Sequence, residues 1–143
     1  MTNPTVKRSE SYSRTRRDHA LETAEDYVEA IAETIGSKGH CRAVDLAEQF
    51  GVSHVTVSKI VARLNQDGLV SVAPYQPIDL TSDGKAMATR VKKRHETVLQ
   101  FLICLGVDMK TAIVDSEGIE HHVSGKTLAK MREFINEHGI QRQ

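Results

Sequence analysis

Two acids and a histidine lie close together late in the sequence, in the run Glu-Gly-Ile-Glu-His-His at 117–122. If this run is helical, Glu117, Glu120 and His121 occupy positions i, i+3 and i+4, which places their side chains on one face. Carboxylates and an imidazole that converge in this way suit a divalent first-row metal. The same pattern is also typical of ordinary surface charge, so the run alone does not establish a site.

Further candidate ligands lie upstream of this run. Asp26 and Glu29, again at i and i+3, share one edge of a predicted helix, and His95 lies in a basic helical stretch. Each of these alone is more typical of a solvated side chain than of a ligand. Together the four carboxylates and two imidazoles favour Mn²⁺ or Fe²⁺, and they suffice for a pair of ions that share carboxylates.

A helix-turn-helix is predicted between the two acid groups, over residues 43–66. A first helix at 43–50 is followed by a sharp turn at Gly51 and by a second helix that Ser53 caps. The second helix and its cap carry polar side chains that can reach base edges or phosphates: Ser53, His54, Thr56, Ser58, Lys59 and Arg63.

A β-hairpin is predicted directly after this motif, with strands at 69–73 and 78–80 and a turn at 74–77. A hairpin in this position is typical of a DNA-binding wing. Its tip offers Tyr75 and Gln76 instead of a basic residue, and both are candidate DNA contacts.

The predicted fold is mainly α with a small β-wing: a winged helix-turn-helix DNA-binding domain followed by a helical dimerisation domain. Residues 1–17 are polar and basic, and we predict a flexible arm that is either a disordered tail or a phosphate-contacting segment. The DNA-binding domain is assigned to residues 18–82, with Asp18 as the cap of its first helix. The metal-binding and dimerisation domain is assigned to residues 83–143.

The dimerisation domain is predicted from three helices, the first over 83–105 and the second from Met109 to about Val123. The second half of the first helix is nearly apolar all round, which is unusual for a surface helix. Burial against a second copy of the chain would explain it, so a homodimer is expected.

Composition narrows the classes of function. The net charge is zero, so contact with double-stranded DNA must come from a local patch. Cys41 and Cys104 form no metal-type cluster, which favours a reducing, cytoplasmic compartment. No apolar run approaches the ~18 residues of a membrane span. A nucleophile motif and a phosphate loop are also missing, so neither an enzyme nor a small-molecule substrate is expected.

The segment 25–31, the helix-turn-helix, Arg94-His95 and the run at 117–122 together resemble the manganese transport regulators of the diphtheria toxin repressor family, over roughly residues 18–140. The resemblance implies a homodimer that binds a palindromic operator when loaded with Mn²⁺ and represses manganese uptake genes. It also implies a binuclear metal site made by Asp26, Glu29, His95, Glu117, Glu120 and His121.

The resemblance also bears on the choice of metal. Iron-type relatives tend to have Met at the position of Asp26 and Cys at that of Glu117, so two oxygen ligands favour Mn²⁺ over Fe²⁺. His19 and Glu22 either add a peripheral metal site or cap and solvate the first helix. Two other interpretations stay open: a winged-helix DNA binder with another trigger, in which the acid-histidine face is structural, and a metallohydrolase.

Overall fold

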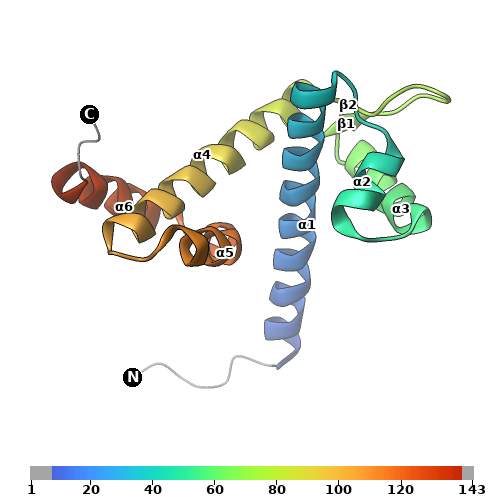
Figure 1. Cartoon of the computed structure of the whole chain (residues 1–143). Helices are drawn as coiled ribbons and strands as arrows, with labels where there is room; N and C mark the ends of the chain where they lie inside the picture. Colours follow the sequence, from blue (N-terminus) through green and yellow to red (C-terminus); the bar gives the residue numbers. More distant parts are fainter. Residues whose placement is uncertain (1–7, 140–143) are drawn as a thin grey trace. The chain divides into compact units, whose positions relative to one another are not determined.

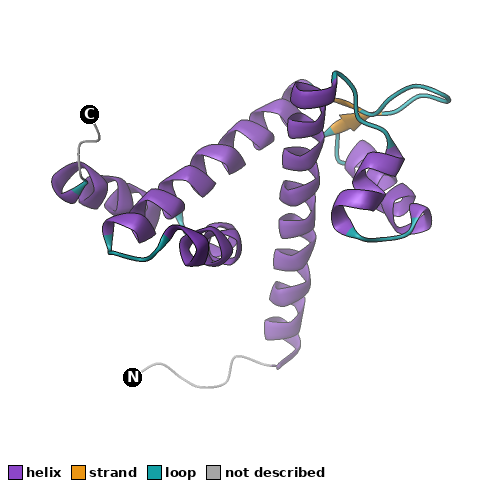
Figure 2. Cartoon of the chain, viewed as in Figure 1, coloured by secondary structure: helices purple, strands orange, loops and turns teal. Residues whose placement is uncertain are grey.

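The computed structural model describes residues 8–139, which form six α-helices, a 3₁₀ turn and a two-stranded antiparallel sheet (Figure 1, Figure 2). The elements are α1 Arg8–Lys38, α2 Ala43–Phe50, α3 His54–Gln66, β1 Val70–Ser71, β2 Asp79–Leu80, α4 Ser82–Cys104, α5 Met109–Ile119, η1 Glu120–His122 and α6 Gly125–His138. The chain divides into two compact units, the first ending at Ala88 and the second beginning at Thr89. This division falls within α4, whereas the predicted boundary followed Ser82.

Helix α1 begins at Arg8 instead of the predicted Asp18, so residues 8–17, which were predicted as part of the arm, are helical. This stretch has no apolar periodicity to reveal a helix, but its arginines are good helix formers. The rest of the predicted arm, residues 1–7, lies outside the described residues. His19 and Glu22 lie inside α1, which means that they cannot cap it.

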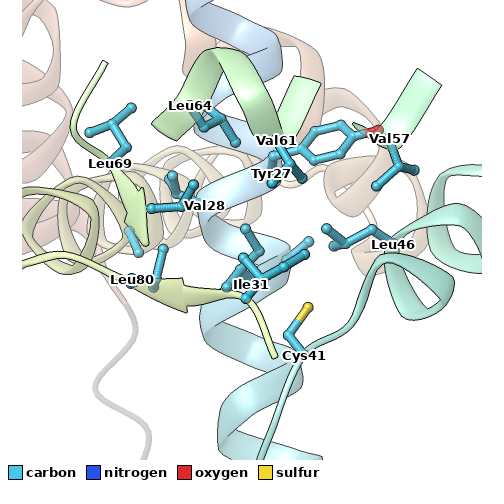
Figure 3. Packing of buried hydrophobic residues seen from close by; sticks show 14 of the residues in the cluster. Tyr27, Val28, Ile31, Cys41, Leu46, Val57, Val61, Leu64, Leu69 and Leu80 are labelled. Carbon is cyan, nitrogen blue, oxygen red and sulfur yellow. The ribbon is translucent and has the colours of Figure 1, made fainter. Parts of the chain in front are cut away.

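The core of the first unit forms where α1 packs against the helix-turn-helix and the sheet (Figure 3). Val28 and Ile31 of α1 are completely buried, as are Leu46 of α2 and Val57 of α3. Tyr27 stacks on Phe50, with ring centroids 4.2 Å apart. Burial of these apolar side chains is the main stabilising contribution, and it holds α3 against the scaffold of α1.

The helix-turn-helix is confirmed in its detail. Gly51 follows α2 with a φ of 63°, a left-handed conformation that glycine adopts without strain. The hydroxyl of Ser53 accepts a hydrogen bond from the backbone N–H of Thr56 at 3.2 Å, so Ser53 caps α3 as predicted.

The wing is a shorter ladder than predicted, because only Val70–Ser71 and Asp79–Leu80 pair as strands. Residues 72–76 are exposed and have no core to pack against. The N–H of Ile78 donates to the carbonyl of Cys41 at 2.8 Å, which ties the base of the hairpin to the segment before α2. At the start of α4, a Cβ on Gly84 would collide with the backbone carbonyl of Leu69, so glycine permits this close approach.

The second unit contains the rest of α4 together with α5, η1 and α6. Val98 and Ala112 are completely buried, and Phe101 meets Phe134 edge to face at 5.4 Å. Helix α5 ends at Ile119, so the prediction of a continuous α-helix to about Val123 is wrong in its last turn. The chain tightens into a 3₁₀ turn and becomes extended by Val123, because Ser124 must take an extended conformation to cap α6.

Among the described residues, no helix combines the length and the apolar character needed to cross a membrane.

Candidate metal centre and DNA interface

Three of the six predicted metal ligands meet around the carboxylate of Glu120 in the second unit. His95 comes from α4, and its Nδ1 lies 2.7 Å from Glu120 Oε2. The other carboxylate oxygen, Oε1, lies 3.4 Å from Nε2 of His121, the next residue in η1. Glu120 itself is only 3 % exposed. A buried carboxylate between two imidazoles is a set of oxygen and nitrogen donors that suits Mn²⁺ or Fe²⁺.

The electrostatics of Glu120 result from two opposing effects. Burial raises the pKa of its carboxyl, because the charged form loses solvation, and the neighbouring His95 and His121 lower it. Burial of a charged carboxylate without polar partners costs free energy. The partners of Glu120 are the imidazoles of His95 and His121, which are both predicted metal ligands.

Glu117 and Glu120, three residues apart, differ in burial. Glu117 is exposed near the end of α5, whereas Glu120 is buried at the start of η1. The backbone at Glu120 nevertheless stays helical (φ −57°, ψ −32°) and its N–H donates to the carbonyl of Ser116, so Glu117 and Glu120 keep a helical spacing of three residues. The chain tightens into the 3₁₀ turn from Glu120 to His122.

The remaining two predicted ligands belong to the first unit. Asp26 and Glu29 are both half-buried on α1 and lie one turn apart. Glu25, beside them in the sequence, is 5 % exposed. His19 is exposed and Glu22 is half-buried, and Glu22 lies one turn before Asp26 on the same helix.

The predicted DNA contacts all lie on the exposed surface of the first unit. Those of α3 occupy its outward side, because Val57, Val61 and Leu64 turn the opposite side into the core. Lys59 and Arg63 are spaced i, i+4, so they share one edge of this exposed helix. Such a helix, held by a capped turn, has the form of a recognition helix that enters a major groove.

The tip of the wing is unusually exposed. Tyr75 is 97 % exposed and has a φ of 62°, a left-handed conformation that costs a non-glycine residue about 1–2 kcal/mol. The turn is closed by the N–H of Gln76, which donates to the carbonyl of Ala73 at 3.1 Å. Strain of this kind is often found at functional sites, and here it presents an aromatic side chain to solvent.

One cationic cluster joins residues that the sequence marked only separately as possible DNA contacts. Arg16 and Arg17 of α1 line a surface recess together with Arg63 of α3 and Ala20. Their separation in the sequence is large, so only the packing of α3 on α1 reveals the cluster. In the sequence, the basic character of residues 1–17 was the feature that pointed toward this cluster.

A winged helix joined to a helical unit with clustered carboxylate and imidazole side chains is the arrangement of a metal-responsive DNA-binding regulator. Comparison with known families supports this class. Residues 19–78 match the model described as "Iron dependent repressor, N-terminal DNA binding domain", and residues 81–139 match "Iron dependent repressor, metal binding and dimerisation domain". The chain therefore belongs to the iron-dependent repressor family.

Individual relatives agree with this assignment. The transcriptional regulator MntR of Escherichia coli O6:H1 is 41 % identical over 132 residues, which cover 92 % of this chain and 85 % of the relative. The HTH-type transcriptional regulator MntR of Bacillus subtilis (strain 168) is 38 % identical over 111 residues, 78 % of each chain. These relatives are transcriptional regulators by name.

A solved structure described as a manganese-dependent transcriptional repressor complex with manganese matches with a TM-score of 0.71 and 29 % identity. The match covers 79 % of this chain but only 52 % of that one, so this chain spans about half the length of the solved structure. The predicted fold and family are thus confirmed, and the chain is a metal-dependent DNA-binding transcriptional repressor.

Proposed function

We propose that Mn²⁺ is the activating metal and that Asp26, Glu29, His95, Glu117, Glu120 and His121 hold it as a pair of ions. The observation that carries the proposal is the buried Glu120 carboxylate between His95 and His121. The ions would act as a switch, because bound metal favours whichever arrangement of the two units gathers ligands from both. Bound Mn²⁺ would contribute its positive charge and its bonds to the ligands.

The choice of Mn²⁺ over Fe²⁺ rests on the donor atoms. All six side chains offer oxygen or nitrogen, and none offers the softer sulfur. Mn²⁺ is the harder of the two ions and is well served by carboxylates. The manganese complex of the solved relative points the same way, while Fe²⁺ stays the alternative.

The proposed target is a palindromic operator in cytoplasmic DNA, bound by a homodimer that represses manganese uptake genes. An isologous dimer presents two recognition helices related by a twofold axis, which matches the symmetry of a palindrome. Support for the dimer comes from apolar side chains exposed on the second unit, among them Ile113 and Val114 of α5.

The metal site is tested by anaerobic titration with Mn²⁺, in which electron paramagnetic resonance measures the free ion. We expect uptake of about two ions per chain. Glu117→Ala and His121→Ala should each lose at least one of them, because each removes a proposed ligand. The matched controls are Glu133→Ala, an exposed carboxylate of α6, and His122→Ala, the exposed imidazole beside His121.

Uptake of about one ion by the parent would keep a metal sensor but remove the binuclear site. If the two ligand variants take up as much Mn²⁺ as the two controls, the ligand assignment is wrong.

A further inference from the structure

Two surface recesses in the first unit share a wall. The smaller, of about 570 Å³, is lined by Arg16, Arg17, Ala20 and Arg63. Ala20 and Arg63 also line the larger recess, of about 700 Å³, whose border includes Lys59. The four cations of this surface, Arg16, Arg17, Lys59 and Arg63, are called the basic strip below.

Helical spacing explains why the strip is continuous. Arg16 and Arg17 lie four and three residues before Ala20, so all three residues lie on the same side of α1. Lys59 and Arg63 lie one turn apart along α3. All four side chains are exposed, and Asp67 is the acidic residue that borders the larger recess.

Three guanidinium groups around one recess favour an anionic ligand with several oxygen acceptors. Guanidinium groups bind phosphate oxygens in paired, charge-assisted hydrogen bonds. Because the strip runs directly from α3, the helix that carries the predicted base contacts, the phosphates nearest to it would be those of the DNA itself.

We propose that the N-terminal part of α1 is a second DNA-contacting element, in which Arg16 and Arg17 bind backbone phosphates beside the segment read by α3. This inference rests on the proposed function, since it requires that α3 faces DNA. Phosphate contacts position a protein on the duplex without reading its sequence. The basic strip should therefore increase the affinity for any duplex and leave the sequence preference to α3 and the wing.

The salt dependence of DNA binding tests the basic strip. Each phosphate contact contributes about 0.9 to the slope of log affinity against log salt concentration. Arg16→Gln/Arg17→Gln removes two contacts from each chain, so a bound dimer loses four and its slope should fall by about 3.6. The affinity deficit of this variant should consequently be about 150-fold larger at about 50 mM salt than at about 200 mM.

The measurement is fluorescence anisotropy of the full chain with Mn²⁺ and a mixed-sequence duplex of about three helical turns. Arg16→Lys/Arg17→Lys keeps both charges and should keep the parental slope. Lys126→Gln/Arg132→Gln removes two exposed charges from α6 and is the matched control. Glutamine is also a good helix former, so circular dichroism of the variants should match that of the parent.

Three outcomes are informative. A slope reduced only in the glutamine variant of Arg16 and Arg17 supports the proposal. An unchanged slope in that variant, with a parent that binds DNA in a Mn²⁺-dependent way, overturns the proposal but leaves the proposed function intact. A parent that binds, with Mn²⁺, neither this duplex nor any duplex selected from a random pool overturns the proposed function and this inference with it.

Discussion

A single side chain, Asp45, joins the end of α1 to the start of the helix-turn-helix. One of its oxygens accepts a hydrogen bond from Lys38 Nζ at 2.6 Å, and the other accepts from the backbone N–H of Arg42 at 2.8 Å. The bond from Lys38, followed by the bond from Arg42, lowers the pKa of the Asp45 carboxyl. The charged form is therefore more stable in the folded protein than in the unfolded chain.

The lowered pKa predicts how pH changes the contribution of Asp45 to stability. The contribution is present above the unfolded pKa of about 3.9 and is lost as the pH falls through the lower folded value. Asp45→Asn should thus reduce the free energy of unfolding at pH near 7, and the difference from the parent should shrink below about pH 4. Urea unfolding at both pH values measures this.

The control for this prediction is Asp115→Asn, which changes an exposed aspartate of α5. A difference between Asp45→Asn and the parent that stays constant with pH would show that the charge of Asp45 contributes nothing.

The residue types of the candidate site were predictable from their spacing, whereas the contact between His95 and Glu120 was expected only from the family resemblance. Acid and histidine spacing marked Glu120 and His121 as neighbours on one turn. His95 lies 25 residues from Glu120, and local periodicity carries no information about such a contact. The 3₁₀ turn that buries Glu120 depends on the cap of the following helix, which competes with α-helical propensity at the end of α5.

At the scale of elements, the accuracy of the predictions follows the strength of local signals. The turn at Gly51 and the cap at Ser53 were predicted to the residue, because each is fixed by a few neighbouring side chains. The start of α1 was missed by ten residues, from Asp18 back to Arg8, since a stretch without recurring apolar residues leaves no periodic pattern in the sequence.

The exposed apolar side of α5 gives an element-scale prediction. Ile113 is 43 % and Val114 is 66 % exposed. If these side chains are buried in a homodimer, a carboxylate in their place would make dimer formation cost free energy. We therefore expect Ile113→Glu/Val114→Glu to sediment as a monomer and the parent to sediment as a dimer. Sedimentation velocity at micromolar concentration measures this.

The control for the dimer is Val72→Glu, which places a carboxylate on an exposed apolar residue after β1 and should leave a dimer. A parent that is a monomer at micromolar concentration would contradict the proposed assembly, and a dimeric double variant would exclude this side of α5 from the interface.

At the scale of the whole molecule, the function requires that metal ligands and DNA contacts be energetically coupled. The six proposed ligands divide between the two units, whereas the predicted DNA contacts all belong to the first. If metal binds ligands of both units, as proposed, it would restrict how the units move, and this restriction would change the affinity for DNA. Coupling between two sites of a protein is commonly about 1–3 kcal/mol, which corresponds to about 5- to 150-fold in affinity.

The most direct measurement is the affinity of the full chain for duplexes selected from a random pool, with Mn²⁺ and with a chelator. We expect Mn²⁺ to tighten binding within the range of about 5- to 150-fold. His121→Ala should lose this stimulation and His122→Ala should keep it. Equal affinity with and without Mn²⁺, or full stimulation of His121→Ala, would contradict a metal switch built on these residues.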